Sequence, residues 1–287
     1  MDPVWRRLYT AMVTPFDERG AIDPGPIGDF LDFQHTAGIE GVVVCGTNGE
    51  GPSLSVAERM TLLEKVIERR GAMGIIAATG AASIADATAL TRHASAVGAD
   101  AVLVLPPFFF PEASGAGVAA ALRVALDAAE IPALLYHIPQ VARVGITPDV
   151  ADLVDRHPRL AGVKDSSGSA NSVRQFASRP GWRVFVGHDR LVSLVTTLGA
   201  AGAISGTANA LPELVATAAS GQDGAQERLD AALDVIARYP AFETNRAILR
   251  ARGIPTGPPR PPLVGLSARQ ERELIADLRS VGALGGP

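Results

Sequence analysis

The sequence predicts a TIM barrel, an α/β fold of eight (β/α) units, followed by a C-terminal helical appendage. The length of 287 residues suits one large barrel, typically of about 250 residues, with an extension. Short apolar runs alternate eight times with segments of helical periodicity, and after Leu211 only helical patterns follow. We therefore expect a (β/α)8 barrel domain over residues 1–215 and a C-terminal helical region over residues 216–287.

The predicted strands are short and nearly continuous in apolar residues, as expected of parallel strands that are covered on both faces. They lie at residues 8–13, 41–45, 74–78, 101–105, 133–137, 160–164, 183–186 and 203–205. Eight βα units in series close most simply into a barrel. A doubly wound open sheet is the alternative, but no Gly-x-Gly-x-x-Gly motif follows the first strand.

Helices are predicted between the strands and after the last of them. The clearest lie at residues 55–70, 83–97, 117–129 and 147–156. Ser55-Val-Ala-Glu58 has the form of a capping box, and Thr147-Pro148 places a proline just inside a helix start. Two or three further helices, interrupted by the Gly- and Pro-rich residues 253–262, form the appendage.

Composition and charge exclude several classes of protein. The net charge of −4 offers no basic field, so we expect neither nucleic acid nor membrane as a partner. The single cysteine, Cys45, excludes an intrachain disulfide framework and fits a reducing compartment. The first fifteen residues lack the apolar core of a signal peptide, which predicts a cytoplasmic protein.

Lysine usage gives the sharpest indication of chemistry. Of 26 basic residues, only Lys65 and Lys164 are lysines. Lys65 lies on a charged helix face, whereas Lys164 ends an apolar strand, at the edge where such barrels carry their active sites. Arginine stays protonated, whereas a desolvated lysine attacks carbonyl carbons. We interpret Lys164 as an amine nucleophile; a lysine paired with a carboxylate inside the barrel is the structural alternative.

Tyr136 closes the strand that precedes the lysine strand. A phenol there can transfer protons during carbinolamine formation or bind a substrate carboxylate, and a barrel-rim tyrosine with a satisfied hydroxyl is the alternative. His137 should point the other way, towards the helices, and is interpreted as structural. Because the other histidines show no metal-ligand spacing, we expect no metal site and no zinc-dependent aldolase.

The segment Gly46-Thr-Asn-Gly-Glu50 follows the second predicted strand. Its glycines let backbone N–H groups approach an anion, and Thr47 adds a hydroxyl donor, which suits a carboxylate. An ordinary glycine-rich βα loop is the alternative. The simplest interpretation of Glu50 is that it orders this loop, and that of Cys45 is core packing.

Together, five segments resemble the dihydrodipicolinate synthase/N-acetylneuraminate lyase family, in order and over nearly the whole chain. They are Thr14-Pro-Phe16, Gly46-Thr-Asn-Gly-Glu50, Tyr136-His-Ile-Pro139, Gly162-Val-Lys-Asp-Ser-Ser-Gly168 and Gly202-Ala-Ile-Ser-Gly-Thr-Ala-Asn209. The resemblance implies that the barrel is catalytic and that Lys164 forms a Schiff base with pyruvate or another 2-oxo acid. It implies no metal or organic cofactor, and a homotetramer built as a dimer of dimers with help from the C-terminal helices.

The resemblance also implies roles for further residues. Tyr136 relays protons and contacts the substrate carboxylate, Thr47 and Asn48 hold that carboxylate, and Ile204 adds a backbone contact. The protonated imine then acts as an electron sink for cleavage of a C–C bond, or for enamine attack on an aldehyde. Gly187 and Asp189, after the seventh predicted strand, offer contacts to substrate hydroxyls.

Departures from the family pattern bear on the substrate. Dihydrodipicolinate synthases carry an arginine five residues after the tyrosine, where this chain has Val141, with Arg143 two residues further on. They also use a second tyrosine, donated across the dimer, whose counterpart here is Phe109, a candidate substrate-binding residue. Asn48 replaces the second threonine of the loop. Sialic acid lyases read Gly-Ser-Thr-Tyr-Asn in the eighth-strand segment, where this chain has Ser205-Gly-Thr-Ala-Asn209.

These features favour a class I aldolase or lyase that acts on a 2-keto-3-deoxy sugar acid or another 4-hydroxy-2-oxo acid. Three alternatives are open: a 4-hydroxy-tetrahydrodipicolinate synthase that condenses pyruvate with aspartate semialdehyde, a 2-keto-3-deoxy acid dehydratase, and a non-catalytic barrel that binds 2-oxo acids.

Overall fold

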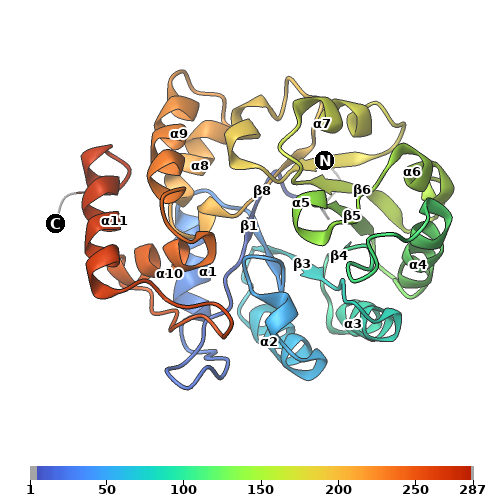
Figure 1. The fold of residues 1–287 in the computed structure, drawn as a ribbon, viewed down its shortest axis with the longest axis horizontal. Helices are drawn as coiled ribbons and strands as arrows, with labels where there is room; N and C mark the ends of the chain where they lie inside the picture. The colour runs from blue at the N-terminus through green and yellow to red at the C-terminus, as the bar shows by residue number, and fades with distance from the viewer. Residues whose placement is uncertain (1–4, 286–287) are drawn as a thin grey trace.

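A computed structural model describes residues 5–285, apart from the side chain of Ala241 (Figure 1). Residues 1–4, the start of the segment assessed for a signal peptide, and residues 286–287 lie outside the described residues. Eight parallel strands form a closed barrel in sequence order, which confirms the predicted fold class. The strands are β1 (Leu8–Ala11), β2 (Gly41–Val44), β3 (Gly74–Ala78), β4 (Ala101–Val104), β5 (Ala133–His137), β6 (Leu160–Asp165), β7 (Arg183–Val186) and β8 (Gly202–Ser205).

Helices surround the barrel. They are α1 (Ile27–Thr36), α2 (Val56–Glu68), α3 (Ile84–Val97), α4 (Gly115–Asp127), α5 (Pro139–Ala142), α6 (Pro148–Val154), α7 (Ala170–Ala177) and α8 (Pro212–Ala219). The four for which ranges were predicted, α2, α3, α4 and α6, differ from the prediction by at most two residues at each end. The capping box of Ser55 and Glu58 is formed at the start of α2. Short 3-10 helices follow β2, β7 and β8: Gly51–Ser53, Asp189–Leu194 and Thr207–Asn209.

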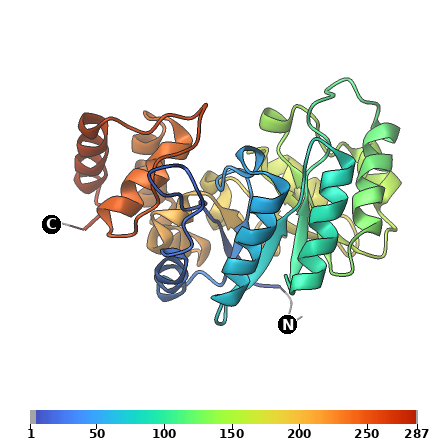
Figure 2. The ribbon, with the colours of Figure 1, turned by 90° about the horizontal axis from the view of Figure 1, so that it is seen from below.

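The C-terminal region consists of three helices that stand at one side of the barrel (Figure 2). They are α9 (Ala225–Ile236), α10 (Ala241–Ala251) and α11 (Ala268–Ser280). Arg252, at the end of α10, donates to the carbonyl of Ala210 at 3.0 Å and pairs with Glu213 of α8. The predicted boundary between residues 215 and 216 lies inside α8, and the division into two domains stays a prediction. No helix in the described part of the chain has the length and apolarity needed to cross a bilayer.

Two apolar layers enclose the sheet, because successive side chains of a strand point to opposite faces. In β2, Val43 belongs to the barrel interior, whereas Val42 and Val44 pack against the surrounding helices. The interior layer also contains Tyr9 and Phe185, whose rings meet edge to face at 5.8 Å. These large side chains fill the inside of the barrel.

A β-bulge in β6 determines which residue lies beside Tyr136. Ala133 of β5 pairs with Leu160, but the next residue, Leu134, pairs with Gly162, so that one extra residue lies in β6. From there on the register aligns Tyr136 with Lys164. Gly162 adopts a φ of +146°, and a Cβ there would lie 1.9 Å from the carbonyl oxygen of Arg183 in β7.

Gly162→Ala should therefore destabilise the barrel severely. We expect a loss of about 3 kcal/mol or more, because the methyl group overpacks the sheet and the backbone conformation disfavours an L-residue. Urea denaturation measures the change as a lower transition midpoint. Gly28→Ala is the matched control, since nothing lies within 4 Å of its Cβ position in α1 and alanine favours the helix. Equal midpoints for Gly162→Ala and the wild type would contradict the steric requirement for glycine at this position.

Candidate active site

The side chain of Lys164 lies inside the barrel near the carboxyl end of β6 and is only 4% exposed. Its Nζ is 3.4 Å from Oη of Tyr136 and lies over the tyrosine ring, 4.6 Å from the centroid. Among the described residues, Lys164 forms no ion pair, so the alternative of a carboxylate-paired lysine is not supported. The buried amine is thus left available for chemistry.

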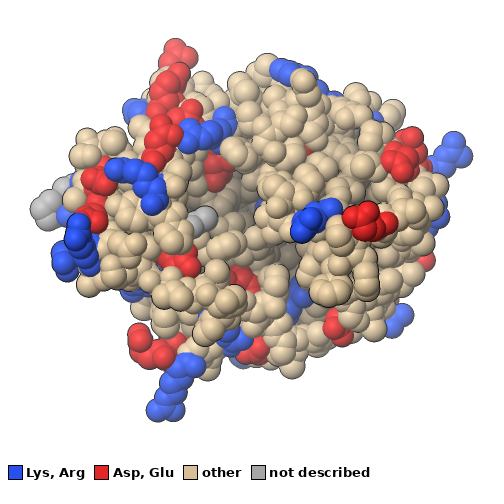
Figure 3. Space-filling model, viewed as in Figure 1, with Lys and Arg blue, Asp and Glu red and all other residues tan. Residues whose placement is uncertain are grey.

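A cavity of about 350 Å³ opens above this amine. Its walls come from segments at or after the carboxyl ends of β2, β5, β6, β7 and β8, and from α9 and α10. Polar residues on the wall include Thr47, Asn48, Gln140, Ser166, His188, Asp189, Thr207, Thr244 and Asn245. The face seen in Figure 3 is hollowed near its middle.

Tyr136 connects Lys164 to Thr47. Its Oη lies 3.4 Å from Oγ1 of Thr47, so the three polar groups form a chain at the floor of the cavity. Burial alone would raise the pKa of Tyr136. The charge of Lys164, with hydrogen bonds from Thr47, Ser166 and Lys164, outweighs this effect and lowers the pKa below its ordinary value. The lowered pKa makes it easier for this phenol to lose and regain a proton.

Gly187 makes room for the lysine. A Cβ at this position would lie 2.1 Å from Oγ of Ser166 and 2.8 Å from Cε of Lys164, so any larger residue would displace the amine. Ser166 donates a hydrogen bond to the carbonyl of Gly187 at 3.2 Å, and Gln140 donates to the carbonyl of Ser166 at 2.6 Å. The predicted site residue Gly187 thus shapes the cavity through its lack of a side chain.

The loop Gly46-Thr-Asn-Gly-Glu50 is a tight turn at the cavity wall. The N–H of Glu50 donates to the carbonyl of Thr47, and the N–H of Gly51 to that of Gly46, each at 3.1 Å. Asn48 packs closely against Gly206, where a Cβ would lie 2.8 Å from its Nδ2. Glu50 turns away from the cavity and forms a buried ion pair with Arg246, as expected of a residue that orders the loop.

Asp189 lies on the cavity wall, and Thr207 holds its carboxylate. Oδ2 accepts hydrogen bonds from the backbone N–H of Thr207 at 3.0 Å and from its hydroxyl at 2.7 Å. Oδ1 is buried and has no hydrogen-bond partner among the described residues. The side chain of Ile204 is fully buried in the barrel interior, which leaves only its backbone for a substrate.

Phe109 does not reach the cavity in the single chain. Its side chain is 73% exposed, and its ring meets that of Phe110 edge to face at 5.4 Å. The loop after β4 carries it outward, so the predicted contact with substrate is not formed within one chain. Val141 is exposed and Arg143 has a left-handed φ of 57°, and neither lines the cavity.

His137 faces the helix layer, which confirms its structural interpretation. Its Nδ1 accepts a hydrogen bond from the N–H of Ile146 at 2.9 Å, and its ring packs edge to face on Phe176. Burial lowers the pKa of His137, against the opposing effect of Asp165. Within the described residues, no group of three His, Cys, Asp or Glu side chains is placed to hold a metal ion.

The sequence analysis missed the contribution of α10. Thr244 and Asn245 line the cavity, and Nδ2 of Asn245 donates to the carbonyl of Gly206 at 3.1 Å and to Oδ1 of Asn48 at 3.5 Å. The polar run Glu243-Thr-Asn-Arg246 directly before apolar residues was the available indication. On an amphipathic helix, such a run normally faces solvent.

A second cavity, of about 400 Å³, meets the first at Thr47 and Tyr136. Arg59 and Phe108 lie on its wall. The guanidinium of Arg59 donates to the carbonyls of Gly80 at 3.0 Å and Ala78 at 2.6 Å. Thr47 and Tyr136 therefore line both cavities.

Comparison with known proteins agrees with this geometry. A model of the dihydrodipicolinate synthetase family matches residues 4–281. An uncharacterised DapA-like lyase of Chloroflexus aurantiacus is 38% identical over 290 residues, covering 96% of this chain and 95% of that protein. The 4-hydroxy-tetrahydrodipicolinate synthase of Prochlorococcus marinus is 32% identical over 287 residues, with coverage of 96% and 95%.

A solved structure, the N-acetylneuraminate lyase of Proteus mirabilis, superposes with a TM-score of 0.89 at 26% identity. The superposition covers 98% of this chain and 99% of that one. The sequence resemblance is thereby confirmed at the level of the family.

The three tyrosines should titrate separately. Burial raises the pKa of Tyr9 to about 12, and burial with nearby Asp277 raises that of Tyr239, whereas that of Tyr136 is lowered. Ultraviolet absorbance should therefore show one tyrosinate forming below pH 10, the ordinary pKa of tyrosine. Tyr136→Phe should abolish this first step. Lys164→Met should move it to higher pH, because the cation that stabilises the phenolate is gone; an unchanged first step would contradict the assigned proximity.

Proposed function

Because the chain belongs to the dihydrodipicolinate synthetase family, we propose that it makes or cleaves a C–C bond between pyruvate and an aldehyde through a Schiff base on Lys164. The chain is an enzyme of this family, a lyase of the class I pyruvate aldolase type. One observation supports Lys164 above all: its buried amine forms no ion pair with any described residue and lies 3.4 Å from the phenol of Tyr136 beneath a cavity.

Formation of the imine uses the series of polar groups that runs from the amine of Lys164 through the phenol of Tyr136 to the hydroxyl of Thr47. The unprotonated Nζ attacks the 2-oxo carbon, while Tyr136 gives its phenolic proton to the former carbonyl oxygen and recovers a proton from the nitrogen. A second proton transfer from Tyr136 lets the hydroxyl leave as water and leaves the protonated imine. Thr47, 3.4 Å from the phenol, exchanges the proton onward.

The imine then accepts electrons from the bond that breaks. In the cleavage direction, the phenolate of Tyr136 takes the proton of the C4 hydroxyl, and the C3–C4 electrons move into the imine. An aldehyde departs, and the remaining enamine is protonated at C3. Addition of water to the imine then releases pyruvate and restores the amine. Synthesis follows the same steps in reverse.

The carboxylate of pyruvate is assigned to Thr47 and Asn48, with Ile204 contributing only through its backbone. The glycines that flank the two loop residues allow backbone N–H groups to approach an anion. The hydroxyl of Thr47 lies beside Tyr136, so a carboxylate bound there places the 2-oxo carbon near Nζ of Lys164. This arrangement orients the 2-oxo carbon towards the amine, and such orientation of the reacting groups accounts for much of the rate gain in enzymes.

The remaining walls favour an uncharged, hydroxylated aldehyde. Among the described residues that line the cavity, Lys164 and Arg190 are the cations, and Arg190 is paired with Asp230 and Asp234. A second substrate carboxylate therefore lacks an unpaired cation, whereas Asp189 and Asn245 can meet hydroxyl groups. We assign the enzyme to a 2-keto-3-deoxy sugar acid or a similar 4-hydroxy-2-oxo acid.

Condensation of pyruvate with aspartate semialdehyde is the second candidate, because the Prochlorococcus marinus relative is a 4-hydroxy-tetrahydrodipicolinate synthase. Against it stand Val141, exposed away from the cavity, and Phe109, which cannot carry a proton. A dehydratase would expel the 3-hydroxyl from the same imine. A non-catalytic barrel would bind the 2-oxo acid without turnover.

Assembly as a dimer of dimers forms part of the proposal. The rings of Phe109 and Phe110, 73% and 64% exposed, are large apolar groups on one loop, of the kind that a second copy buries. A partner would then close the side of the site that one chain leaves open. A cytoplasmic location is proposed from the single buried cysteine, which suits a reducing compartment.

Borohydride trapping tests the Schiff base. Reduction in the presence of pyruvate should add one reduced pyruvyl group to the protein, and peptide mass spectrometry should locate it on Lys164. Lys164→Arg should give no adduct, because a guanidinium does not form the imine. Lys65→Arg is the matched control and should be labelled like the wild type, since Lys65 lies on the surface of α2. Labelling of Lys164→Arg would reject the mechanism.

A substrate panel tests the aldehyde half. Pyruvate released from several 2-keto-3-deoxy sugar acids is compared with the condensation of pyruvate and aspartate semialdehyde. We expect kcat/KM for the best sugar acid to exceed that of the condensation by about a hundredfold, the effect of leaving one carboxylate without a cation. Faster condensation would instead identify a synthase. Release of water with no aldehyde would identify a dehydratase, and trapping without any turnover a binding protein.

A further inference from the structure

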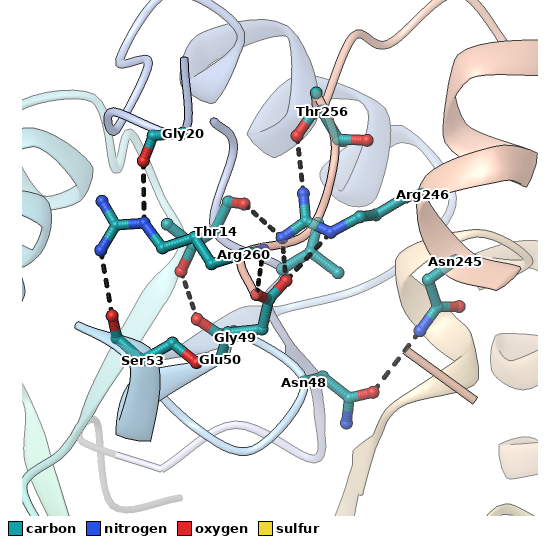
Figure 4. A network of polar contacts seen from close by, with 12 residues as sticks. Thr14, Gly20, Asn48, Gly49, Glu50, Ser53, Asn245, Arg246, Thr256 and Arg260 are labelled. Atoms are coloured by element: carbon teal, nitrogen blue, oxygen red, sulfur yellow. Dashed lines mark hydrogen bonds and ion pairs between the residues drawn. The ribbon is translucent and has the colours of Figure 1, made fainter. Parts of the chain in front are cut away.

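A buried ion pair joins the carboxylate-binding loop to the C-terminal helices. The side chains of Glu50 and Arg246 are each 1% exposed. Oε1 of Glu50 accepts hydrogen bonds from Nε of Arg246 at 3.1 Å and from its Nη2 (Figure 4). Burying either charge alone is strongly unfavourable, so the pair requires that both segments stay in place.

The other donors of Arg246 hold two further segments. Nη1 donates to the carbonyl of Thr256 at 2.6 Å, and Nη2 to that of Thr14 at 2.9 Å, while the guanidinium lies 4.9 Å from the ring centroid of Phe16. The planar, rigid fork of arginine satisfies these acceptors at once, which a lysine ammonium does not. One side chain therefore fixes α10 against the loops that follow β1 and β2.

Glu50 transmits this constraint to the substrate loop. Its φ of 54° is left-handed, a conformation that costs a non-glycine residue about 1–2 kcal/mol. Its Oε2 accepts from the N–H of Arg260 at 3.0 Å, and its own N–H closes the turn onto the carbonyl of Thr47. From the opposite side, the hydroxyl of Thr14 donates to the carbonyl of Gly49 at 2.5 Å. The turn is thus held at both ends of the Gly49–Glu50 peptide.

We propose that Arg246 is a positioning residue: through Glu50 it holds Thr47 and Asn48 where their donors meet the substrate carboxylate. The inference rests on the proposed function, in which this loop binds pyruvate. Arg246 is not on the cavity wall and acts through the residues it holds. Its neighbour Asn245 is hydrogen-bonded to the carbonyl of Gly206 and to Asn48. By fixing α10, Arg246 therefore also positions Asn245 on the cavity wall.

Paired variants separate positioning from stability. Arg246→Gln leaves Glu50 buried without its counter-charge and should destabilise the fold. The double variant Glu50→Gln with Arg246→Gln leaves no unpaired charge and should recover most of the thermal stability. Arg70→Met is the matched control: Arg70 contacts Asp100 and the carbonyls of Met73 and Gly98, all at the amino ends of β3 and β4.

Two measurements are made on each full-length variant: borohydride trapping as a function of pyruvate concentration, and amide hydrogen exchange of residues 46–51. In the double variant, the half-saturating pyruvate concentration should rise about tenfold or more, because a displaced loop loses its oriented donors. The trapping rate at saturation should fall by a smaller factor than the half-saturating concentration rises, since Lys164 and Tyr136 are untouched and only Thr47 of the proton relay is displaced. Exchange of residues 46–51 should be faster, and Arg70→Met should show neither change.

The proposal would be overturned if the double variant kept both the half-saturating pyruvate concentration and the amide exchange of residues 46–51 of the wild type. Failure of the proposed function is recognised separately, because the wild type itself would then not be trapped by pyruvate. In that case, amide hydrogen exchange in the double variant tests the positioning role by itself. Faster exchange of residues 46–51 supports the role, and unchanged exchange rejects it.

Discussion

The contact between the amine of Lys164 and the phenol of Tyr136 depends on strand register. A shift of one residue moves every side chain of a strand to the other face. Without the extra residue before Gly162, Val163 would lie beside Tyr136, and Lys164 would point into the helix layer. The bulge therefore places the amine of Lys164 inside an apolar barrel, and Gly187 provides the space in which it lies.

Environment gives two buried tyrosines opposite properties. Tyr9 lies deep in the barrel against Phe185, where burial raises its pKa to about 12 and its oxygen accepts a hydrogen bond from the N–H of Arg6. Tyr136 is as well buried, but a lysine cation and several donors surround its oxygen, and its pKa is lowered. The apolar interior thus supplies a packed core, while the polar layer above it supplies a phenol that can exchange protons.

The fold, the floor of the site and part of its wall follow from local sequence, whereas the contribution of α10 to the wall does not. Apolar runs ending in Tyr136 and Lys164 are visible as patterns, because each depends on the chain within a few residues. The contribution of Asn245 depends on how α10 packs about two hundred residues after the loop that it contacts, and a polar run on a helix normally indicates solvent. Phe109 could not be placed either, since a group that lies outside the cavity of its own chain depends on a partner for any role in the site.

The two halves of the substrate therefore meet parts of the protein that are constrained differently. The pyruvate half is assigned to strand ends and to a loop held by the buried Glu50–Arg246 pair, where any displacement also disturbs the barrel. The aldehyde half is assigned to Asp189, Asn245 and the side chains of α9, which are supported by short 3-10 turns and by the C-terminal helices. Substitutions in this second set leave the sheet and the amine in place. The same chemistry can therefore be retained while the accepted aldehyde changes, and the specificity of this chain has to be sought in its outer walls and C-terminal helices.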